Sequence, residues 1–187
     1  SYTYRGFDLT ACTLNGAAYD VSEFTLEAAG ENALNLTYTA NADRMLFKTP
    51  DANGKPYRIP AIATAKNGHI IAVADNRPCG SDVGYGEVDL KARISKDNGA
   101  TWGTEFLIAN GTGVEASPVA FDYAFGDAAI VADSRSSEVL VVCVTGNTVY
   151  GHSTTTRQNP NRVAIIRSYD NGETWNAPEE ITESIYS

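Results

Sequence analysis

Two side chains in the first half of the chain could act together on an anionic ligand. Arg58 lies in the tetrapeptide Tyr57-Arg58-Ile59-Pro60, and Asp82 follows 24 residues later in a glycine-rich loop. A guanidinium grips a carboxylate through two parallel hydrogen bonds, a geometry that lysine does not copy. A carboxylic acid in a loop from which a ligand excludes water can donate a proton to a leaving oxygen. The pair therefore predicts binding and acid/base chemistry on an acidic ligand.

Each of these residues, taken alone, also has an ordinary structural explanation. A lone arginine is more often a surface or ion-paired residue than a ligand-binding one. Aspartate favours turns, so Asp82 also fits a turn position. We expect the same exposed or turn positions for the neighbouring acidic residues Asp75, Glu87 and Asp89. Only a scaffold that brings Arg58 and Asp82 together would favour the chemical interpretation.

An octapeptide that occurs twice indicates what that scaffold is. The segment 95–102, Ser-Lys-Asp-Asn-Gly-Ala-Thr-Trp, recurs 73 residues later as 168–175, Ser-Tyr-Asp-Asn-Gly-Glu-Thr-Trp, with six of eight positions identical. Upstream, Ala61-Ile62 is matched by Ala129-Ile130, 68 residues later. An internal repeat of this length is typical of architectures that stack similar units.

The residues common to the two octapeptides have a structural explanation. We expect the two aspartates to accept hydrogen bonds from backbone N–H groups, the glycine of each octapeptide to supply a positive φ, and the tryptophans to anchor the next strand between sheets. The loops lack the alternating acidic ligands of an EF-hand, so we expect no calcium site there. The shared residues are Ser95, Asp97, Gly99, Thr101 and Trp102 in the first copy, and Ser168, Asp170, Gly172, Thr174 and Trp175 in the second.

Short β-branched segments separated by turn residues predict an all-β fold. Each repeat reads as four antiparallel strands, which is typical of propeller blades. Residues 1–50 do not join the repeat, and we interpret them as a β-rich segment or the end of a preceding domain. The expected strands are 24–27, 34–38 and 45–47 in that segment, 59–65, 69–74, 88–95 and 104–109 in the first blade, and 128–133, 139–144, 163–168 and 175–181 in the second.

Composition excludes several classes of function. The 187 residues carry a formal net charge of −9 with a sequence pI near 4.6, which argues against a nucleic-acid partner. No run of some eighteen apolar residues exists, so we expect no membrane span. Three widely spaced cysteines, Cys12, Cys79 and Cys143, allow at most one disulfide and fit no common metal motif.

The Tyr-Arg-Ile-Pro tetrapeptide, the two residues Arg77 and Asp82 beyond it, and the two S-x-D-x-G-x-T-W boxes together resemble bacterial exo-α-sialidases (neuraminidases). The resemblance covers residues 57 to about 181. It implies a six-bladed β-propeller of which residues 51–187 form the first two blades, with the boxes on the outer edge, far from the site. It also implies that the protein is secreted or periplasmic.

The resemblance further implies roles for individual residues. Arg58 looks like the first of three arginines that bind the sialic acid carboxylate, and Asp82 like the general acid/base. Arg77 resembles the arginine near the sugar's C4 hydroxyl. Asp127 is similar to an acidic residue near the N-acetyl or C4 side, although a turn aspartate before a strand explains it as well. The nucleophilic tyrosine, its glutamate and two further arginines would lie on later blades.

These residues imply hydrolysis of terminal sialic acid from glycoconjugates with retention of configuration, without metal or organic cofactor. The expected partners are sialylated glycans and the remaining propeller blades, from the same polypeptide or another chain. We expect the 187 residues to be a fragment with an incomplete site. Two other readings stay open: a non-catalytic glycan-binding or interaction module, and a trans-sialidase or anhydro-forming enzyme that shares every residue named here.

Overall fold

The computed structural model describes residues 3–4, 7–20, 33–40, 45–115 and 120–186. They belong to two compact units, residues 1–45 and 46–187. Among the described residues, no helix has the length and apolar character needed to cross a membrane. The strand expected at 24–27 lies outside the described residues.

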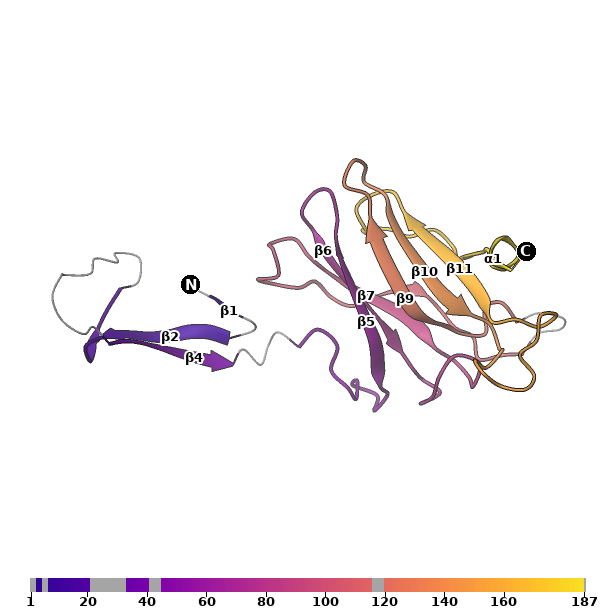
Figure 1. Ribbon diagram of the computed structural model, residues 1–187, viewed down its shortest axis with the longest axis horizontal. Helices are drawn as coiled ribbons and strands as arrows, with labels where there is room; N and C mark the ends of the chain where they lie inside the picture. Colours follow the sequence, from indigo (N-terminus) through magenta and orange to yellow (C-terminus); the bar gives the residue numbers. More distant parts are fainter. Residues whose placement is uncertain (1–2, 5–6, 21–32, 41–44, 116–119, 187) are drawn as a thin grey trace. The chain divides into compact units, whose positions relative to one another are not determined.

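The first unit is a small antiparallel sheet. Strand β2 (Phe7–Leu14) pairs with β1 (Thr3–Tyr4), β3 (Ala17–Ala18) and β4 (Leu34–Ala40) (Figure 1). The strand expected at 34–38 is therefore confirmed, and β2 was missed. The strand expected at 45–47 is wrong, because these residues form bends. Leu46 and Phe47 instead belong to the second unit, where the Phe47 ring lies 5.2 Å from the Tyr57 ring.

The second unit consists of two four-stranded antiparallel meanders, which we name blade 1 and blade 2 (Figure 1). The all-β prediction is confirmed. In blade 2 the strand expected at 175–181 shrinks to two paired residues, because Pro178 has no N–H to donate to a ladder. Blade 1 contains β5 (Tyr57–Thr64), β6 (Ile70–Asn76), β7 (Asp89–Ser95) and β8 (Phe106–Ala109), and blade 2 contains β9 (Phe125–Ala132), β10 (Val139–Thr145), β11 (Arg162–Ser168) and β12 (Glu179–Glu180), followed by helix α1 (Thr182–Ile185).

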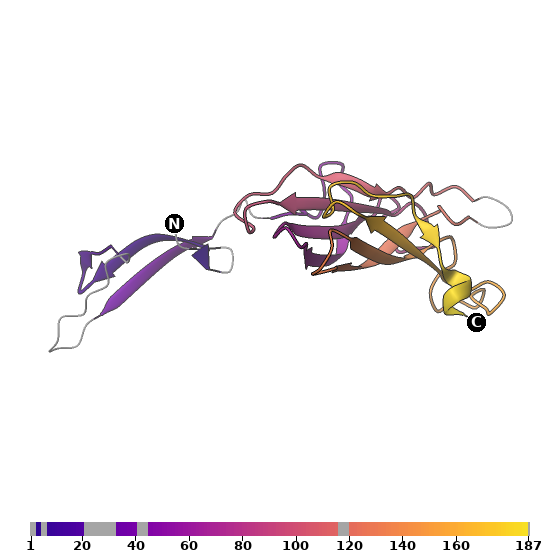
Figure 2. The same cartoon turned by 90° about the horizontal axis from the view of Figure 1, so that it is seen from above.

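The two blades share one hydrophobic core. In β7 and β10 buried residues alternate with more exposed ones, as expected for sheets that bury one face fully. Viewed from above, the two sheets stack face to face (Figure 2). This burial joins the blades into one unit. The core between them includes Ile71, Val73, Leu90, Ala92 and Ile94 from blade 1, and Val139, Val141, Cys143, Ala164 and Ile166 from blade 2.

Both octapeptide turns have the predicted hydrogen bonds. Asp97 Oδ1 accepts the Thr101 N–H at 2.7 Å, and the Ser95 hydroxyl oxygen accepts the Gly99 N–H at 2.7 Å. In the second copy the corresponding distances to Asp170 and Ser168 are both 2.8 Å. The Thr101 hydroxyl, which donates to Asp97 Oδ2, and the Thr101 N–H hold the pKa of Asp97 down at about 2. The boxes are therefore self-contained turns that close a hairpin.

The second box also packs against blade 1. Trp175 is partly buried against the shared core, and its ring N–H donates to the Gly172 carbonyl at 2.9 Å. Gly172 is buried, and a Cβ placed on it would lie only 2.4 Å from the Ile71 side chain. In the first box, a Cβ on Gly99 would meet nothing closer than 3.9 Å. The second box is thus part of the contact between the blades. Glycine is required at position 172 because a larger side chain would overlap Ile71.

This difference gives a stability prediction for a matched pair of variants. Gly99 and Gly172 have φ of +85° and +89°, so alanine at either position carries a similar backbone cost of about 1–2 kcal/mol. Gly172→Ala adds the overlap with Ile71, and overpacking costs about 1–3 kcal/mol. We expect urea unfolding to show Gly172→Ala as clearly less stable than Gly99→Ala. Equal losses would show that the second box does not join the blades.

Candidate active site

The first strand of each blade contains a β-bulge at the equivalent position. The pairing of β5 with β6 shifts register between Arg58 and Ala61, and the pairing of β9 with β10 shifts between Val142 and Val144. Ile59 has φ of +50° and Asp127 has φ of +55°. The two positions are 68 residues apart, the same offset that relates the blades. Positive φ is unfavourable for a branched residue such as isoleucine, and bulges of this kind re-aim side chains beside functional sites.

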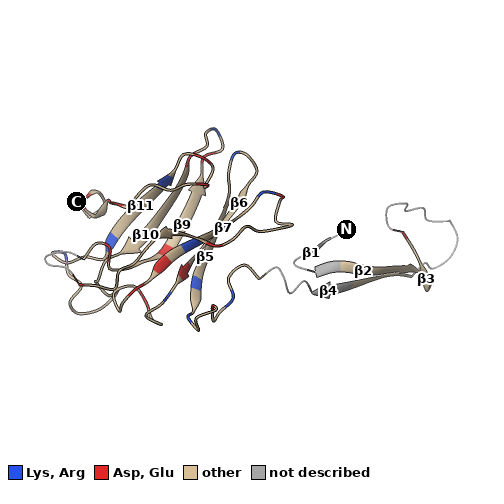
Figure 3. Ribbon diagram, turned by 180° about the vertical axis from the view of Figure 1, so that it is seen from behind, with Lys and Arg blue, Asp and Glu red and all other residues tan. Residues whose placement is uncertain are grey.

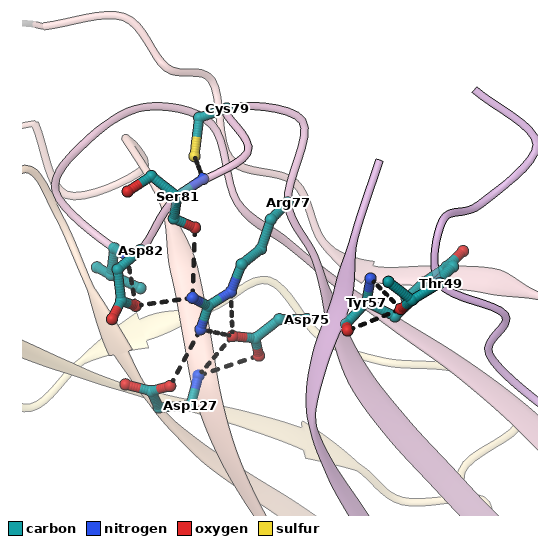
Figure 4. A network of polar contacts seen from close by, with 9 residues as sticks. Thr49, Tyr57, Asp75, Arg77, Cys79, Ser81, Asp82 and Asp127 are labelled. Carbon is teal, nitrogen blue, oxygen red and sulfur yellow. Dashed lines mark hydrogen bonds and ion pairs between the residues drawn. The ribbon is translucent and has the colours of Figure 1, made fainter. Parts of the chain in front are cut away.

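Arg77 is the centre of a network of carboxylates (Figure 4). The side chain follows β6 and is 1% exposed. Its Nη2 atom lies 2.8 Å from Asp75 Oδ2 and 3.4 Å from Asp127 Oδ1, and its Nη1 atom lies 3.2 Å from Asp82 Oδ1. Nη1 also donates to the Ser81 carbonyl at 3.3 Å. One guanidinium therefore joins carboxylates from the β6 strand, the loop after it and the neighbouring blade.

Asp75 is the member of this network that sequence reasoning missed. We expected an exposed or turn residue, but its side chain is fully buried and accepts the Asp127 N–H at 3.0 Å. Burial raises the pKa of Asp75 to about 6, against the opposing effect of Arg77 and the Asp127 N–H. A signal was present: Asp75 ends the apolar run of residues 70–74, so its strand enters the core.

Asp89 and Glu87 also differ from the expectation. Asp89 is 5% exposed, and its carboxylate accepts the Gly111 N–H at 2.9 Å. Burial raises the pKa of Asp89, while this hydrogen bond lowers it. Glu87 is half-buried. Exposed positions were therefore wrong for both Asp75 and Asp89, because they lie on β6 and β7, the central strands of a sheet that packs against blade 2.

Asp82 and Asp127 line the same hollow. Their side chains are 58% and 43% exposed, respectively, so each remains accessible while touching the buried Arg77. Burial and the nearby Asp82 charge raise the pKa of Asp127, and Arg77 and Arg58 lower it. The arrangement can present one carboxyl group as a proton donor and another as a hydrogen-bond acceptor. The lining consists of Asp82, Val83, Asp127, Val144, Tyr150, Asn161 and Tyr186.

Arg58 is exposed at the start of β5 and lines a second hollow, not the one that Asp82 lines. Its charge nevertheless lies near enough to Asp127 to lower the pKa of that carboxyl. In Figure 3, basic and acidic segments lie together around β5, β7 and β9. The structure thus places Arg58, Arg77, Asp82 and Asp127 in one region. Their contacts with a ligand stay predictions.

The start of β5 is held in place by contacts that the sequence did not suggest. The Tyr57 hydroxyl donates to Glu105 Oε2 at 2.5 Å, and Lys91 pairs with Glu105 at 3.3 Å. Burial and Glu105 raise the pKa of Tyr57, so the phenol stays neutral. The Thr49 hydroxyl bonds to both the N–H and the carbonyl of Tyr57 (Figure 4). These contacts fix the backbone immediately before Arg58.

The described residues offer little for other site chemistries. The three cysteines are free thiols, and burial raises the pKa of Cys143 to about 12. Across the described ranges, no group of three or more His, Cys, Asp or Glu residues is placed to hold a metal ion. The carboxylate and guanidinium groups around Arg77 are therefore the candidate site.

Comparison with known proteins gives a consistent result. A scan against models of protein families finds no match. A sialidase from Paraclostridium sordellii is 25% identical over 174 residues, covering 93% of this chain and 39% of that protein. A sialidase from Bacteroides fragilis (strain YCH46) is 30% identical over 142 residues, covering 72% of this chain and 26% of that protein. The chain therefore spans well under half the length of these relatives.

Solved structures show the same fold. The Hadza microbial sialidase Hz136 matches with a TM-score of 0.55 and 24% identity, covering 68% of this chain and 26% of that one. The K499G mutant of NanB sialidase from Streptococcus pneumoniae matches with a TM-score of 0.55 and 13% identity, covering 76% and 38%. The chain is thus a sialidase homologue, and its two blades match part of a sialidase β-propeller.

Proposed function

We propose that this chain supplies the carboxylate-binding and acid/base part of an exo-α-sialidase, which hydrolyses terminal sialic acid with retention of configuration. One observation carries the proposal: Arg77 draws Asp82 and Asp127, from different blades, to the rim of one hollow. The sialidase homology supports the same conclusion. Exposure of both carboxyl groups leaves them free to meet a sugar.

In this proposal Asp82 is the general acid/base. As the glycosidic C–O bond breaks, Asp82 gives its proton to the leaving oxygen. In the second half of the reaction Asp82 takes a proton from the water whose oxygen attacks the anomeric carbon. Arg58 binds the sugar's own carboxylate through its planar fork. Because that carboxylate repels an anionic nucleophile, a neutral tyrosine outside these two blades would attack the anomeric carbon as the glycosidic bond breaks, and its proton would pass to the neighbouring glutamate. In the second half water displaces the tyrosine oxygen, which takes that proton back.

The exposed faces of the two blades support the need for further blades. Ile62 on β5 is 62% exposed and Val131 on β9 is 58% exposed, although both belong to strands that are apolar in sequence. Leu107 on β8 is 46% exposed. Apolar side chains gathered on sheet faces are typical of surfaces that another structure covers. We propose that additional propeller blades cover these faces and complete the site.

The proposal predicts the stereochemistry of the product. The native polypeptide that contains these residues, incubated with sialyllactose, is expected to release sialic acid first as the α-anomer, which then mutarotates. Proton NMR of the reaction mixture measures the two anomers over time. Initial release of the β-anomer, an anhydro product or transfer to another sugar would contradict retaining hydrolysis. Binding without release would instead support a glycan-binding module.

A further inference from the structure

Asp75 is a buried carboxylate that the proposed reaction does not use directly. It lies near the end of β6 and is fully buried. Its Oδ2 atom accepts from Arg77 Nη2 at 2.8 Å and from Arg77 Nε at 3.3 Å. The Asp127 N–H lies 3.0 Å from Oδ1 and 3.2 Å from Oδ2. Both partners belong to the candidate site, so Asp75 links blade 1 to the irregular segment of blade 2 (Figure 4).

The bulge in β9 explains why Asp127 needs this carboxylate. At a bulge the extra residue loses its partner in the strand ladder. The ladder between β9 and β10 skips Asp127, since Val142 pairs with Ala129 and Val144 pairs with Gly126. A backbone N–H that is shielded from water must find another acceptor. Asp75 supplies that acceptor from the neighbouring blade.

Gly126 provides the space for Asp75 to approach. A Cβ placed on Gly126 would lie 2.9 Å from Asp75 Oδ2 and 2.7 Å from Val83 Cγ2. Gly126 occupies the position in blade 2 that Arg58 occupies in blade 1, 68 residues earlier. The equivalent positions of the two blades therefore differ in function. Blade 1 has the Arg58 side chain there, and blade 2 has Gly126, which lets Asp75 approach the backbone.

We propose that Asp75 is a positioning residue, which holds the Arg77 guanidinium and the Asp127 backbone so that Asp82 and Asp127 face one hollow. This inference deepens the proposed sialidase function and rests on it. If Asp75 loses its charge, Arg77 keeps only Asp82 and Asp127 as carboxylate partners. The guanidinium then moves toward them and holds Asp82 as an ion-pair acceptor, which hinders its work as a proton donor.

The test compares two sialosides in the native polypeptide. Hydrolysis of a methyl sialoside needs a proton donor, whereas a 4-nitrophenyl sialoside has a leaving group that departs without one. Displacements of about 1 Å in a site can cost about 10²-fold in rate. We expect Asp75→Asn to lower kcat/KM for the methyl sialoside by about 10–100-fold and to affect the 4-nitrophenyl sialoside much less. Gly126→Ala, which pushes Asp75 away from β9, is expected to show the same pattern.

Asp89→Asn is the matched control. It also removes a buried carboxylate from blade 1, but its hydrogen bond goes to Gly111 and not to the site. Urea unfolding of each variant measures any general loss of stability. We expect Asp89→Asn to leave the ratio of the two substrates unchanged. If Asp75→Asn loses activity on both substrates by the same factor, or on neither, the positioning role is overturned.

A second readout separates this inference from the proposed function. We expect hydrogen exchange at the Asp127 amide to be at least about 10-fold faster in Asp75→Asn than in the wild type, because the amide loses a charged acceptor. Unchanged exchange would overturn the link between Asp75 and Asp127. If the wild type cleaves neither sialoside, the proposed function fails, and the exchange measurement alone decides whether Asp75 holds Asp127.

Discussion

Replacing Asp82 with asparagine is expected to abolish most turnover of natural sialosides by the native polypeptide. Asparagine keeps the size of the side chain and can still contact Arg77, but it cannot transfer a proton. General acid/base catalysis contributes about 10²–10⁴-fold, so kcat/KM on sialyllactose should fall by about that factor. Turnover of a 4-nitrophenyl sialoside should fall much less in its first step, because that leaving group departs as an anion.

The measurement is a comparison of kcat/KM, which reports the first step, on the two substrates, with Asp122→Asn as the control. Asp122 is exposed on a loop of the same unit and is not among the residues that line the Asp82 hollow. It should behave as the wild type with both substrates. Wild-type turnover of sialyllactose by Asp82→Asn would remove Asp82 from the mechanism.

Replacing Arg58 is expected to impair binding of the sugar's carboxylate. Two charge-assisted hydrogen bonds from one guanidinium can contribute about 3–4 kcal/mol, which corresponds to about 10²–10³-fold in kcat/KM. We expect a loss of this size for Arg58→Ala, carried mainly by a higher KM. Arg58→Lys keeps the charge but loses the fork, so it should recover only part of the activity.

Arg135→Lys provides the matched control for the loss of the fork. The Arg135 side chain is 92% exposed, on the turn between β9 and β10, where it pairs with Asp133. It should leave both kcat and KM unchanged. If Arg58→Lys is as active as the wild type, bidentate recognition by Arg58 is excluded, and some other group must bind the carboxylate.

The parts of the fold that follow local rules could be predicted from the sequence. The repeated octapeptides define turns whose hydrogen bonds lie within eight residues, so residue types such as Ser95, Asp97 and Gly99 suffice to predict them. Short β-branched segments between turn residues likewise located β6, β7, β10 and β11 to within two residues at their ends. The repeat of this four-strand pattern predicted the two blades.

Features that depend on contacts between distant segments could not be predicted. The burial of Asp75 requires blade 2, which contributes Asp127 and Gly126 more than 50 residues later. The apolar residues 45–47 looked like a strand, but Phe47 packs on the Tyr57 ring and Met45 is exposed. For the final strand, the predicted length ignored Pro178. Tertiary contacts decided the first two cases, whereas Pro178 is a local signal that the sequence itself contains.

The candidate site, like the fold, could be predicted only in part from the sequence. Residue types and spacing singled out Arg58 and Asp82, the resemblance to sialidases added Arg77 and Asp127, and the structure brings all four into one region. What they could not reveal is that Arg77 is buried as the hub of three carboxylates, with Asp82 and Asp127 at the rim. The bulges at Ile59 and Asp127 were also invisible, because a positive φ at isoleucine or aspartate leaves no reliable trace in composition.

The central claim is that Arg58 and Asp82 act on one bound acidic sugar. A crystal structure of the native polypeptide with an unsaturated sialic acid analogue tests it most directly. We expect both guanidinium nitrogens of Arg58 on the ligand's carboxylate, and the Asp82 carboxyl at about 2.6–3.2 Å from the oxygen or water at the reacting carbon. A ligand whose carboxylate lies on other residues while Arg58 faces solvent, or one bound away from Asp82, would contradict the claim.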